Sequence, residues 1–283
     1  MARRDDRAYR QYVREEQHRQ PGCPARELCR EPRGRDTSGW STLAVVDDPV
    51  SKAPDRIAGM FDAIALRYDL LNHLLSAGID RRWRSRAVRA LALTGAEQVL
   101  DLCTGTGDLA IAAATARPGA ARVVGIDFAG VMLGVGRGKL RSAGLERRVT
   151  LVRADATRIP IGHATIDAVT LGFGIRNVED MPAACREVRR VLKPGGRVAI
   201  LEFAVPTTPG LSACYLWYLR HVLPRIGRAV SRHEAAYGYL PASIGTFATP
   251  DEFVKILRQA GFSDISTVPL TFGSVILYTA RRG

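Results

Sequence analysis

Glycines and carboxylates gather at three points of the sequence, each of which follows a short apolar run. The first is a loop, DLCTGTGD (101–108), in which Gly105 and Gly107 let the main chain approach a ligand closely. The second is Asp127, 20 residues beyond Gly107, and the third is Asp155. A carboxylate at the second point can accept two hydrogen bonds from a ribose diol, and one at the third can accept an adenine amino group. The spacing therefore predicts a site for an adenosyl group.

Two kinds of adenosyl ligand fit this loop. The pattern Gly105-x-Gly107-x-x-Ala110, followed by an acidic residue, also satisfies the fingerprint of dinucleotide-binding folds. However, Asp101 and Asp108 place negative charge on both sides of the glycines, which a pyrophosphate would resist and a sulfonium would tolerate. These charges favour S-adenosylmethionine over a nicotinamide dinucleotide. The remaining alternative is an ordinary tight turn between a strand and a helix, with acids added for solubility.

Alternating strands and helices are expected to position these residues. Apolar runs of strand length occur at 98–103, 122–128, 149–155, 166–173 and 197–203. Helical spacing predicts helices over 109–116, 129–143, 180–192 and 250–260. Continuous apolar strands separated by helices indicate a parallel sheet in a doubly wound α/β fold, and the runs 264–270 and 274–280 predict a terminal antiparallel hairpin. Ligands of such folds lie at the carboxyl ends of the strands, where the three acidic points fall.

Two flanking regions and an insert complete the chain. Residues 1–50 are rich in Arg, Glu, Pro and Gly without a sustained apolar period, so we expect a flexible extension. Within a domain of 51–283, helical spacing from Asp55 predicts two or three short helices as a cap over 51–95. Residues 207–247 interrupt the alternation of strands and helices with an aromatic, helix-like insert, which we expect to form a lid.

Composition limits the class of protein. The 283 residues carry 41 basic and 28 acidic side chains, and the net charge of +13 suits an anionic partner or a solvated arginine-rich surface. Five scattered cysteines offer neither a disulfide scaffold nor a CxxC zinc site, so we expect no metal. No apolar run reaches the roughly 18 residues of a membrane-spanning helix, and the N-terminal residues lack the apolar core of a secretory signal. We therefore expect a cytoplasmic protein.

Eight segments resemble one known family and together cover about residue 57 to the C-terminus. They are FDAIALRYDLLNHLLSAGIDRRWR (61–84), VLDLCTGTGDLA (99–110), GIDFAGVML (125–133), GFGIRNVED (172–180), REVRRVLKPGG (186–196), LEFAVP (201–206), LPRIG (223–227) and YGYLPASI (237–244). The chain resembles the class I S-adenosylmethionine-dependent methyltransferases and, more narrowly, the UbiE/COQ5 family of C-methyltransferases of menaquinone and ubiquinone biosynthesis. YDLLN, GFGIRNV and YLPASI are more specific to this family than the glycine loop is. The resemblance implies a seven-stranded, mostly parallel Rossmann-like sheet.

The resemblance also implies roles for particular residues. The implied contacts of S-adenosylmethionine are Asp101, Gly105, Thr106, Gly107, Asp127, Asp155, Ala156 and Gly172. Gly172 stands where relatives often carry serine, so a hydroxyl contact would be absent here. Tyr68 and Asn72 of YDLLN, together with Trp83, are expected to form a cap over the cofactor or the substrate. The alternative for Tyr68 and Trp83 is packing within an N-terminal helical layer.

The implied acceptor is a prenylated quinol, whose ring carbon becomes nucleophilic when the neighbouring hydroxyl loses its proton. Arg176 is expected to be the counter-charge of the resulting oxyanion, with an ordered water as a candidate proton acceptor, or else part of a structural ion pair. Asn177 is expected beside it, or else as the cap of the following helix. Glu202 lies near the site or is only structural. Candidate bases in the insert are His221, His233, Tyr237 and Tyr239, and we place Tyr237 in the catalytic set.

The insert concentrates aromatic residues beside cations. Residues 213–219 (ACYLWYL) adjoin Arg220, His221, Arg225, Arg228 and Arg232. This pattern suits the surface of an anionic membrane, such as the inner face of the cell membrane, from which a prenyl tail would be drawn. A lid helix packed on the core, or a homodimer face, would explain it as well. For the function, the alternatives are a related methyltransferase acting on a soluble phenol or natural product, and a nucleic-acid module, for which no RNP-like motif is present.

Overall fold

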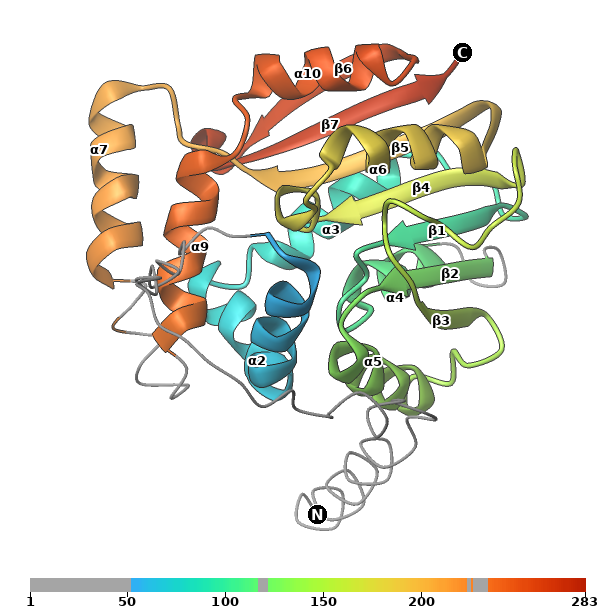
Figure 1. Ribbon diagram of the computed structural model, residues 1–283, viewed down its shortest axis with the longest axis horizontal. Coiled ribbons are helices and arrows are strands. Elements are labelled where there is room, and N and C mark those ends of the chain that lie inside the picture. Colours follow the sequence, from blue (N-terminus) through green and yellow to red (C-terminus); the bar gives the residue numbers. More distant parts are fainter. Residues whose placement is uncertain (1–51, 117–121, 223–224, 226–233) are drawn as a thin grey trace, which may run out of the picture. The chain divides into compact units, whose positions relative to one another are not determined.

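Seven strands form one mixed sheet in the order β3-β2-β1-β4-β5-β7-β6 (Figure 1). The computed structural model describes residues 52–116, 122–222, 225 and 234–283. The neighbouring strands β3, β2, β1, β4 and β5 pair in parallel, whereas β7 runs antiparallel to both β5 and β6. The strands are β1 (Gln98–Leu102), β2 (Arg122–Asp127), β3 (Val149–Arg153), β4 (Ile166–Gly172), β5 (Leu192–Phe203), β6 (Phe262–Leu270) and β7 (Val275–Arg282). The predicted doubly wound sheet with a terminal antiparallel hairpin is confirmed.

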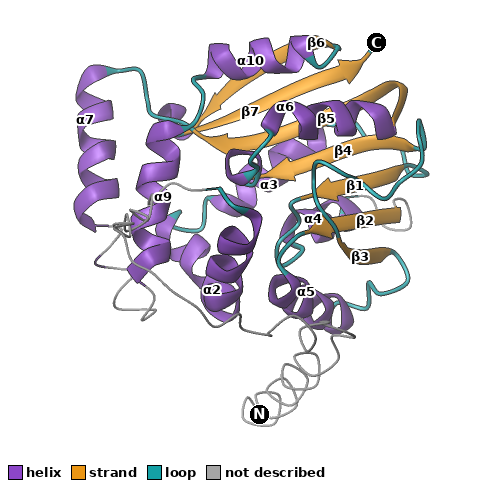
Figure 2. Cartoon of the chain, in the orientation of Figure 1, coloured by secondary structure: helices purple, strands orange, loops and turns teal. Residues whose placement is uncertain are grey.

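Helices precede, separate and cover the strands (Figure 2). The α-helices are α2 (Pro54–Leu75), α3 (Asp80–Ala90), α4 (Asp108–Thr115), α5 (Gly130–Ser142), α6 (Met181–Val191), α7 (Pro209–Trp217), α9 (Glu234–Thr246) and α10 (Pro250–Gln259). Shorter helical turns are η1 (Ile175–Asn177), η2 (Tyr218–Val222) and η3 (Thr271–Gly273). In the N-terminal cap, α2 is a single helix of 22 residues, longer than the short helices that the sequence predicts.

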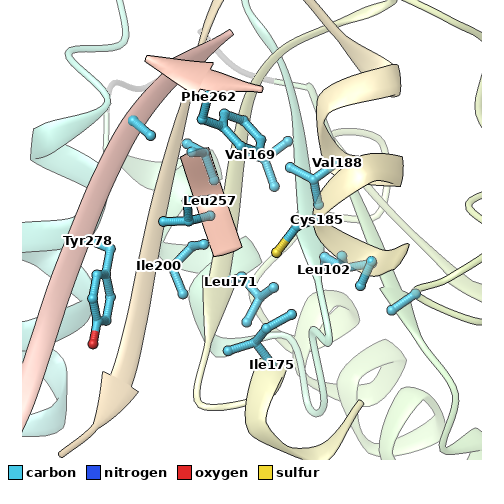
Figure 3. Packing of buried hydrophobic residues seen from close by; sticks show 14 of the residues in the cluster. Leu102, Val169, Leu171, Ile175, Cys185, Val188, Ile200, Leu257, Phe262 and Tyr278 are labelled. Carbon is cyan, nitrogen blue, oxygen red and sulfur yellow. The ribbon is translucent and has the colours of Figure 1, made fainter. Parts of the chain in front are cut away.

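Alternate residues of each strand face opposite sides of the sheet and pack under different helices. In β1, Val99 packs with α3, α4 and α5, whereas Leu100 packs with α6 and α10 on the other face. Figure 3 shows part of this second face, where Cys185 of α6 and Leu257 of α10 lie near Ile200 of β5. Because both faces are covered, the inner strands β1, β4 and β5 are largely buried, whereas the edge strand β6 is mostly exposed.

An irregularity lengthens β5 at its beginning. The sequence predicts a turn at 193–196 followed by a strand over 197–203, but the strand already begins at Leu192. Leu192 pairs with Ile166 and Arg197 pairs with Ala168, so residues 193–196 stand opposite a single residue of β4. Gly195, with a φ of +73°, allows the main chain to make this bulge. The predicted turn is therefore built into the strand.

The insert packs against the C-terminal half of α2. Leu71 of α2, Leu219 of η2 and Ile244 of α9 are buried together. The hydroxyl of Tyr218 donates to the carbonyl of Leu75 at 3.1 Å. Phe203, at the end of β5, packs against the same buried cluster, so η2 and α9 lie next to the end of this strand.

Candidate active site

Two cavities lie next to each other at the carboxyl edge of the sheet. The strand-end cavity, of about 230 Å³, is lined by residues at the ends of β1, β2, β3 and β4. The aromatic cavity, of about 280 Å³, is lined mainly by α2, α3 and the insert. Phe61, Tyr68 and Phe173 line both cavities and form the wall between them. The two cavities therefore adjoin at these three side chains, and a ligand in one cavity would contact a ligand in the other beside them.

Asp127, at the end of β2, holds the glycine loop in the wall of the strand-end cavity. Gly105 has a φ of +56°, and its N–H donates to Asp127 Oδ2 at 2.7 Å. Asp127 Oδ1 accepts a second N–H, from Ala129, at 2.9 Å. Burial raises the pKa of Asp127, although both hydrogen bonds favour the charged form. The carboxylate is fixed in place and keeps lone pairs with which to accept hydrogen bonds from a ligand.

Asp155 and Ala156 close the same cavity at the end of β3. Asp155 Oδ1 accepts the N–H and the hydroxyl of Thr157, at 2.8 and 2.9 Å. Within the described part of the chain, Asp155 Oδ2 has no hydrogen-bond partner, so it can accept one from an amino group. Gly172 at the end of β4 also lines the cavity, and a Cβ there would come within 3.2 Å of Leu109 Cδ2. Five expected cofactor residues thus meet here: Gly105, Asp127, Asp155, Ala156 and Gly172.

Asp101 and Gly107 were expected to contact the cofactor, but they lie behind the cavity wall. Asp101 is fully buried and accepts the hydroxyls of Thr104 and Thr170 at 2.5 and 2.7 Å. Burial raises the pKa of Asp101 to about 6. Gly107, with a φ of +82°, is the residue at which the loop turns into α4. Asp101 and Gly107 therefore set the conformation of the glycine loop without lining the cavity.

Thr106, another expected contact, faces the cap helices instead of the strand-end cavity. Its hydroxyl donates to Asp69 Oδ1 of α2 at 2.5 Å. Lys139 of α5 forms ion pairs with Asp69, at 2.7 Å, and with Asp108 of α4. Arg84 of α3 pairs with Asp108 at 3.1 Å. Of the two charges that flank the glycine loop, Asp108 therefore helps to attach the cap to the sheet domain.

Arg176 is only 5% exposed, and it lines the aromatic cavity. Its Nη1 donates to Glu202 Oε1 at 2.7 Å and to the carbonyl of Phe173. Its Nε lies 3.4 Å from Ser243 Oγ, and the guanidinium carbon is 5.3 Å from the centre of the Phe203 ring. Among the residues that the structure describes, no side chain or carbonyl is bonded to Nη2. Arg176 thus forms the ion pair considered as an alternative and still has one nitrogen for a ligand.

Asn177, which follows Arg176 in η1, lines the strand-end cavity. Its Oδ1 accepts the hydroxyl of Tyr239 at 3.0 Å. The alternative that Asn177 caps the following helix is wrong, because the N-cap of α6 is Asp180, whose side chain accepts the N–H of Ala183. Tyr237 lies in α9, but its side chain is outside the described part of the structure.

Tyr68, Asn72 and Trp83 come together around the aromatic cavity, and Tyr68 also faces the strand-end cavity. Trp83 Nε1 donates to Thr271 Oγ1 of η3 at 2.8 Å. The indole is buried among aromatic rings of the sheet edge, so Trp83 both packs the cap and lines the cavity.

Sequence reasoning did not find Phe173 or Lys52. Phe173 lines both cavities and has a φ of +58°, which is unusual for a residue other than glycine. Its place between two glycines, directly after a strand, is a signal that could have indicated it. Lys52 lines the strand-end cavity, where burial and the nearby charge of Arg176 lower its pKa. No sequence pattern indicates Lys52.

Solved structures identify the class of fold. The chain is similar to an S-adenosylmethionine-dependent methyltransferase from Aquifex aeolicus, with a TM-score of 0.54 and 18% identity over 82% of this chain and 99% of that one. It is also similar to the [4+2]-cyclase SpnF, with a TM-score of 0.60 and 19% identity over 81% and 97% of the two chains. The fold is that of the class I S-adenosylmethionine-dependent methyltransferases.

Sequence comparison identifies the family. The model of the ubiE/COQ5 methyltransferase family matches residues 50–282. The ubiquinone/menaquinone biosynthesis C-methyltransferase UbiE of Syntrophotalea carbinolica is 50% identical over 79% of this chain and 92% of its own length. The demethylmenaquinone methyltransferase of Bacteroides fragilis is 38% identical over 82% and 94% of the two chains. The chain belongs to the ubiE/COQ5 methyltransferase family, as its motifs indicated.

Proposed function

We propose that this protein methylates a ring carbon of a prenylated quinol bound in the aromatic cavity, with Arg176 as the counter-charge of the quinol oxygen. The enzyme is an S-adenosylmethionine-dependent C-methyltransferase of the UbiE type, which serves ubiquinone and menaquinone biosynthesis. The observation that carries the finer proposal is the shared wall. An acidic cavity and an apolar cavity adjoin at Phe61, Tyr68 and Phe173, and a buried arginine faces the apolar one.

The strand-end cavity offers the acceptor groups that S-adenosylmethionine requires. Asp127 would hold the ribose hydroxyls, and Asp155 would hold the adenine amino group. When bound, S-adenosylmethionine supplies an electrophilic methyl group on a sulfonium. The negative charges of Asp127 and Asp155 favour a positively charged ligand in this cavity.

Arg176 is arranged to stabilise negative charge on the acceptor. Glu202, Ser243 and the carbonyl of Phe173 hold its guanidinium, so little reorganisation is needed when a quinol hydroxyl loses its proton. The free Nη2 can donate to the quinol oxygen, which pushes electron density to the adjacent ring carbon. The rings of Phe173 and Phe203, with centroids 4.4 Å apart and an interplanar angle of 32°, add apolar contacts at the same place.

The tyrosines of the aromatic cavity are donors and not bases. Burial raises the pKa values of Tyr68, Tyr215 and Tyr239, so all three hydroxyls stay protonated near neutral pH. The raised pKa of Tyr239 argues against this residue as the base considered from the sequence. We propose that a water beside Arg176 accepts the quinol proton.

The reaction can be tested directly with labelled cofactor. Purified protein would be incubated with S-adenosylmethionine carrying a deuterated methyl group and with chemically reduced demethylmenaquinone or the corresponding benzoquinol. We expect a mass increase of one labelled methyl group, located on the ring by fragmentation. Methylation on oxygen, or turnover of a soluble phenol with neither quinol accepted, would contradict the proposed acceptor.

Replacing Asp127 with alanine is expected to weaken the binding of S-adenosylmethionine by about 1.5–3 kcal/mol, because charge-assisted hydrogen bonds to the ribose are lost. The release of the N–H groups of Gly105 and Ala129 adds to the effect by loosening the loop. Titration calorimetry measures the affinity. Asp167→Ala is a matched control, because that carboxylate pairs with Lys193 outside both cavities. An unchanged affinity of the Asp127 variant would remove this residue from the site.

We also propose that the protein works in the cytoplasm, with the insert against the inner face of an anionic membrane. Trp217 is 58% exposed, and Arg220 and Arg225 beside it are exposed as well. Such a patch can insert an aromatic ring between headgroups while the cations attract anionic lipid. Within the described residues, no helix is long and apolar enough to cross a bilayer. Arg228 and Arg232 lie outside the described residues.

Sedimentation with phosphatidylglycerol vesicles tests this contact. At low salt we expect the wild-type protein to bind and Arg220→Gln to bind about fivefold less, since one surface cation contributes about 1 kcal/mol. Arg258→Gln of α10 is the control, because Arg258 is an exposed cation on a helix outside the insert. If neither protein sediments and light scattering gives twice the monomer mass, the patch is a homodimer face instead.

A further inference from the structure

Two of the three family-specific sequence motifs, GFGIRNV (172–178) and YLPASI (239–244), contact each other in the fold. The hydroxyl of Tyr239, in YLPASI (239–244), donates to Asn177 Oδ1 at 3.0 Å. Ser243, of the same motif, places its Oγ 3.4 Å from Arg176 Nε. The hydroxyl proton of Ser243 is directed to the carbonyl of Leu240, so the oxygen accepts from the guanidinium. Both contacts join α9 to the tripeptide turn η1.

One face of α9 makes both contacts. Tyr239 and Ser243 are four residues apart, so their side chains lie above one another on the same side of the helix. Both are buried, with 6% and 2% of their surface exposed. On the other side of the contact, Arg176 lines the aromatic cavity and Asn177 lines the strand-end cavity. The helix therefore holds one residue of each cavity.

These contacts fix the direction of the Asn177 amide. Because Oδ1 accepts from Tyr239, Nδ2 is turned toward the carbonyl of Phe173, 3.5 Å away. Without the tyrosine hydroxyl, only the longer contact between Nδ2 and the carbonyl of Phe173 would hold this orientation among the described residues. The amide would then be held less firmly beside Arg176.

The acceptor would press on the same helix. Tyr239, Leu240 and Ile244 of α9 line the aromatic cavity. Pro241, inside α9, removes one hydrogen bond of the helix, so the position of α9 depends strongly on what it packs against. A ring and prenyl chain in the cavity would add packing to this face and hold α9 against η1.

We propose that Tyr239 and Ser243 are positioning residues, through which an acceptor packed on α9 fixes Arg176 and Asn177 in the geometry for methyl transfer. The inference rests on the proposed methylation of a quinol and adds the element that couples the two cavities. The hydrogen bonds of Tyr239 with Asn177 and of Ser243 with Arg176 provide this coupling, because each joins α9, which faces the acceptor, to a residue of the reaction site.

Tyr239→Phe removes a single oxygen and is the first test. With demethylmenaquinol of a two-isoprene side chain, we expect kcat to fall about tenfold, the loss that corresponds to one buried hydrogen bond. Because the proposed coupling acts through an acceptor packed on α9, we expect the Kd of S-adenosylmethionine without acceptor to change less than twofold. Ser243→Ala, whose contact is longer, should lower kcat by a smaller factor. Thr246→Ala is the control, because this exposed hydroxyl bonds only to carbonyls of α9 itself.

A double-mutant cycle separates positioning from general loss of structure. If Tyr239 acts through Asn177, then Tyr239→Phe should lower kcat about tenfold in the wild-type background and have no effect in the Asn177→Ala background. The thermal unfolding midpoint is measured for each variant. Equal kcat for Tyr239→Phe and wild type overturns the inference, as do losses that multiply in the double variant.

The same assay distinguishes failure of the inference from failure of the proposed function. Wild-type turnover of demethylmenaquinol tests the function alone, since it does not depend on Tyr239. If wild-type protein methylates only another phenol, the acceptor is corrected, and the ratio of variant to wild-type kcat is measured with that phenol. A ratio of one then overturns the positioning role whichever acceptor is used.

Discussion

Replacing Arg176 with methionine should lower kcat about 10²–10³-fold, the range seen when one preorganised donor to a developing oxyanion is removed. The affinity for S-adenosylmethionine should change little, because Arg176 lines the aromatic cavity and not the strand-end cavity. Steady-state kinetics with demethylmenaquinol and calorimetry with S-adenosylmethionine give the two quantities. An equal loss in both would place Arg176 in cofactor binding.

The single variant has a complication, since it leaves the fully buried carboxylate of Glu202 without its partner. The double variant Arg176→Met, Glu202→Gln contains no unpaired buried charge and is the appropriate background. We expect it to fold with nearly the wild-type stability and to keep the low kcat. Recovery of kcat in the double variant would show that the single variant failed through loss of structure and would refute the oxyanion role.

The second large effect is expected on stability. Glu202→Gln leaves the buried guanidinium of Arg176 without a counter-charge, and removing one partner of such a pair typically costs about 3–5 kcal/mol. Glu202 Oε1 also accepts the N–H of Phe203, a bond that glutamine can keep, whereas Oε2 accepts the N–H of Arg176 at 3.3 Å, a bond that the glutamine amide would lose. The effect therefore reports the lost charge together with one lost hydrogen bond. Urea unfolding followed by circular dichroism measures the free energy of unfolding.

A pair on the surface supplies the comparison. Arg141 and Glu146 lie 3.4 Å apart with 74% and 57% of their side chains exposed, so Glu146→Gln should change the free energy of unfolding by less than about 1 kcal/mol. In the buried pair, adding Arg176→Met to Glu202→Gln should restore most of the lost stability. If Glu202→Gln is no more destabilising than Glu146→Gln, water reaches the pair and the buried counter-charge has no structural role.

The sheet could be predicted from sequence because its signals are local. Apolar runs of strand length alternate with helical spacing, and the acids that end β2 and β3 directly follow such runs. Because parallel strands end at one edge, Asp127 and Asp155 had to come together. The bulge at 193–196 was missed because a KPGG sequence reads as a turn whether or not the strand continues through it.

Residues with alternative hydrogen-bond partners were harder to predict. Thr106 and Asp101 belong to the glycine loop, but the Thr106 hydroxyl bonds to Asp69 and Asp101 accepts from Thr170, and only the tertiary fold brings Asp69 and Thr170 close to the loop. The two interpretations of Arg176 were treated as alternatives, although a guanidinium has five N–H donors and can serve both purposes. The exposed or buried state of a donor is a property of the fold, which sequence spacing does not encode.

The shared wall limits how the enzyme could evolve toward new acceptors. A substitution at Phe61, Tyr68 or Phe173 alters both cavities at once. A change that admits a different acceptor ring therefore also disturbs the binding of S-adenosylmethionine. Tyr218 and Ile244, by contrast, border the aromatic cavity alone. Substitutions that change substrate preference among related enzymes should therefore accumulate in the insert, while the three residues of the shared wall change little.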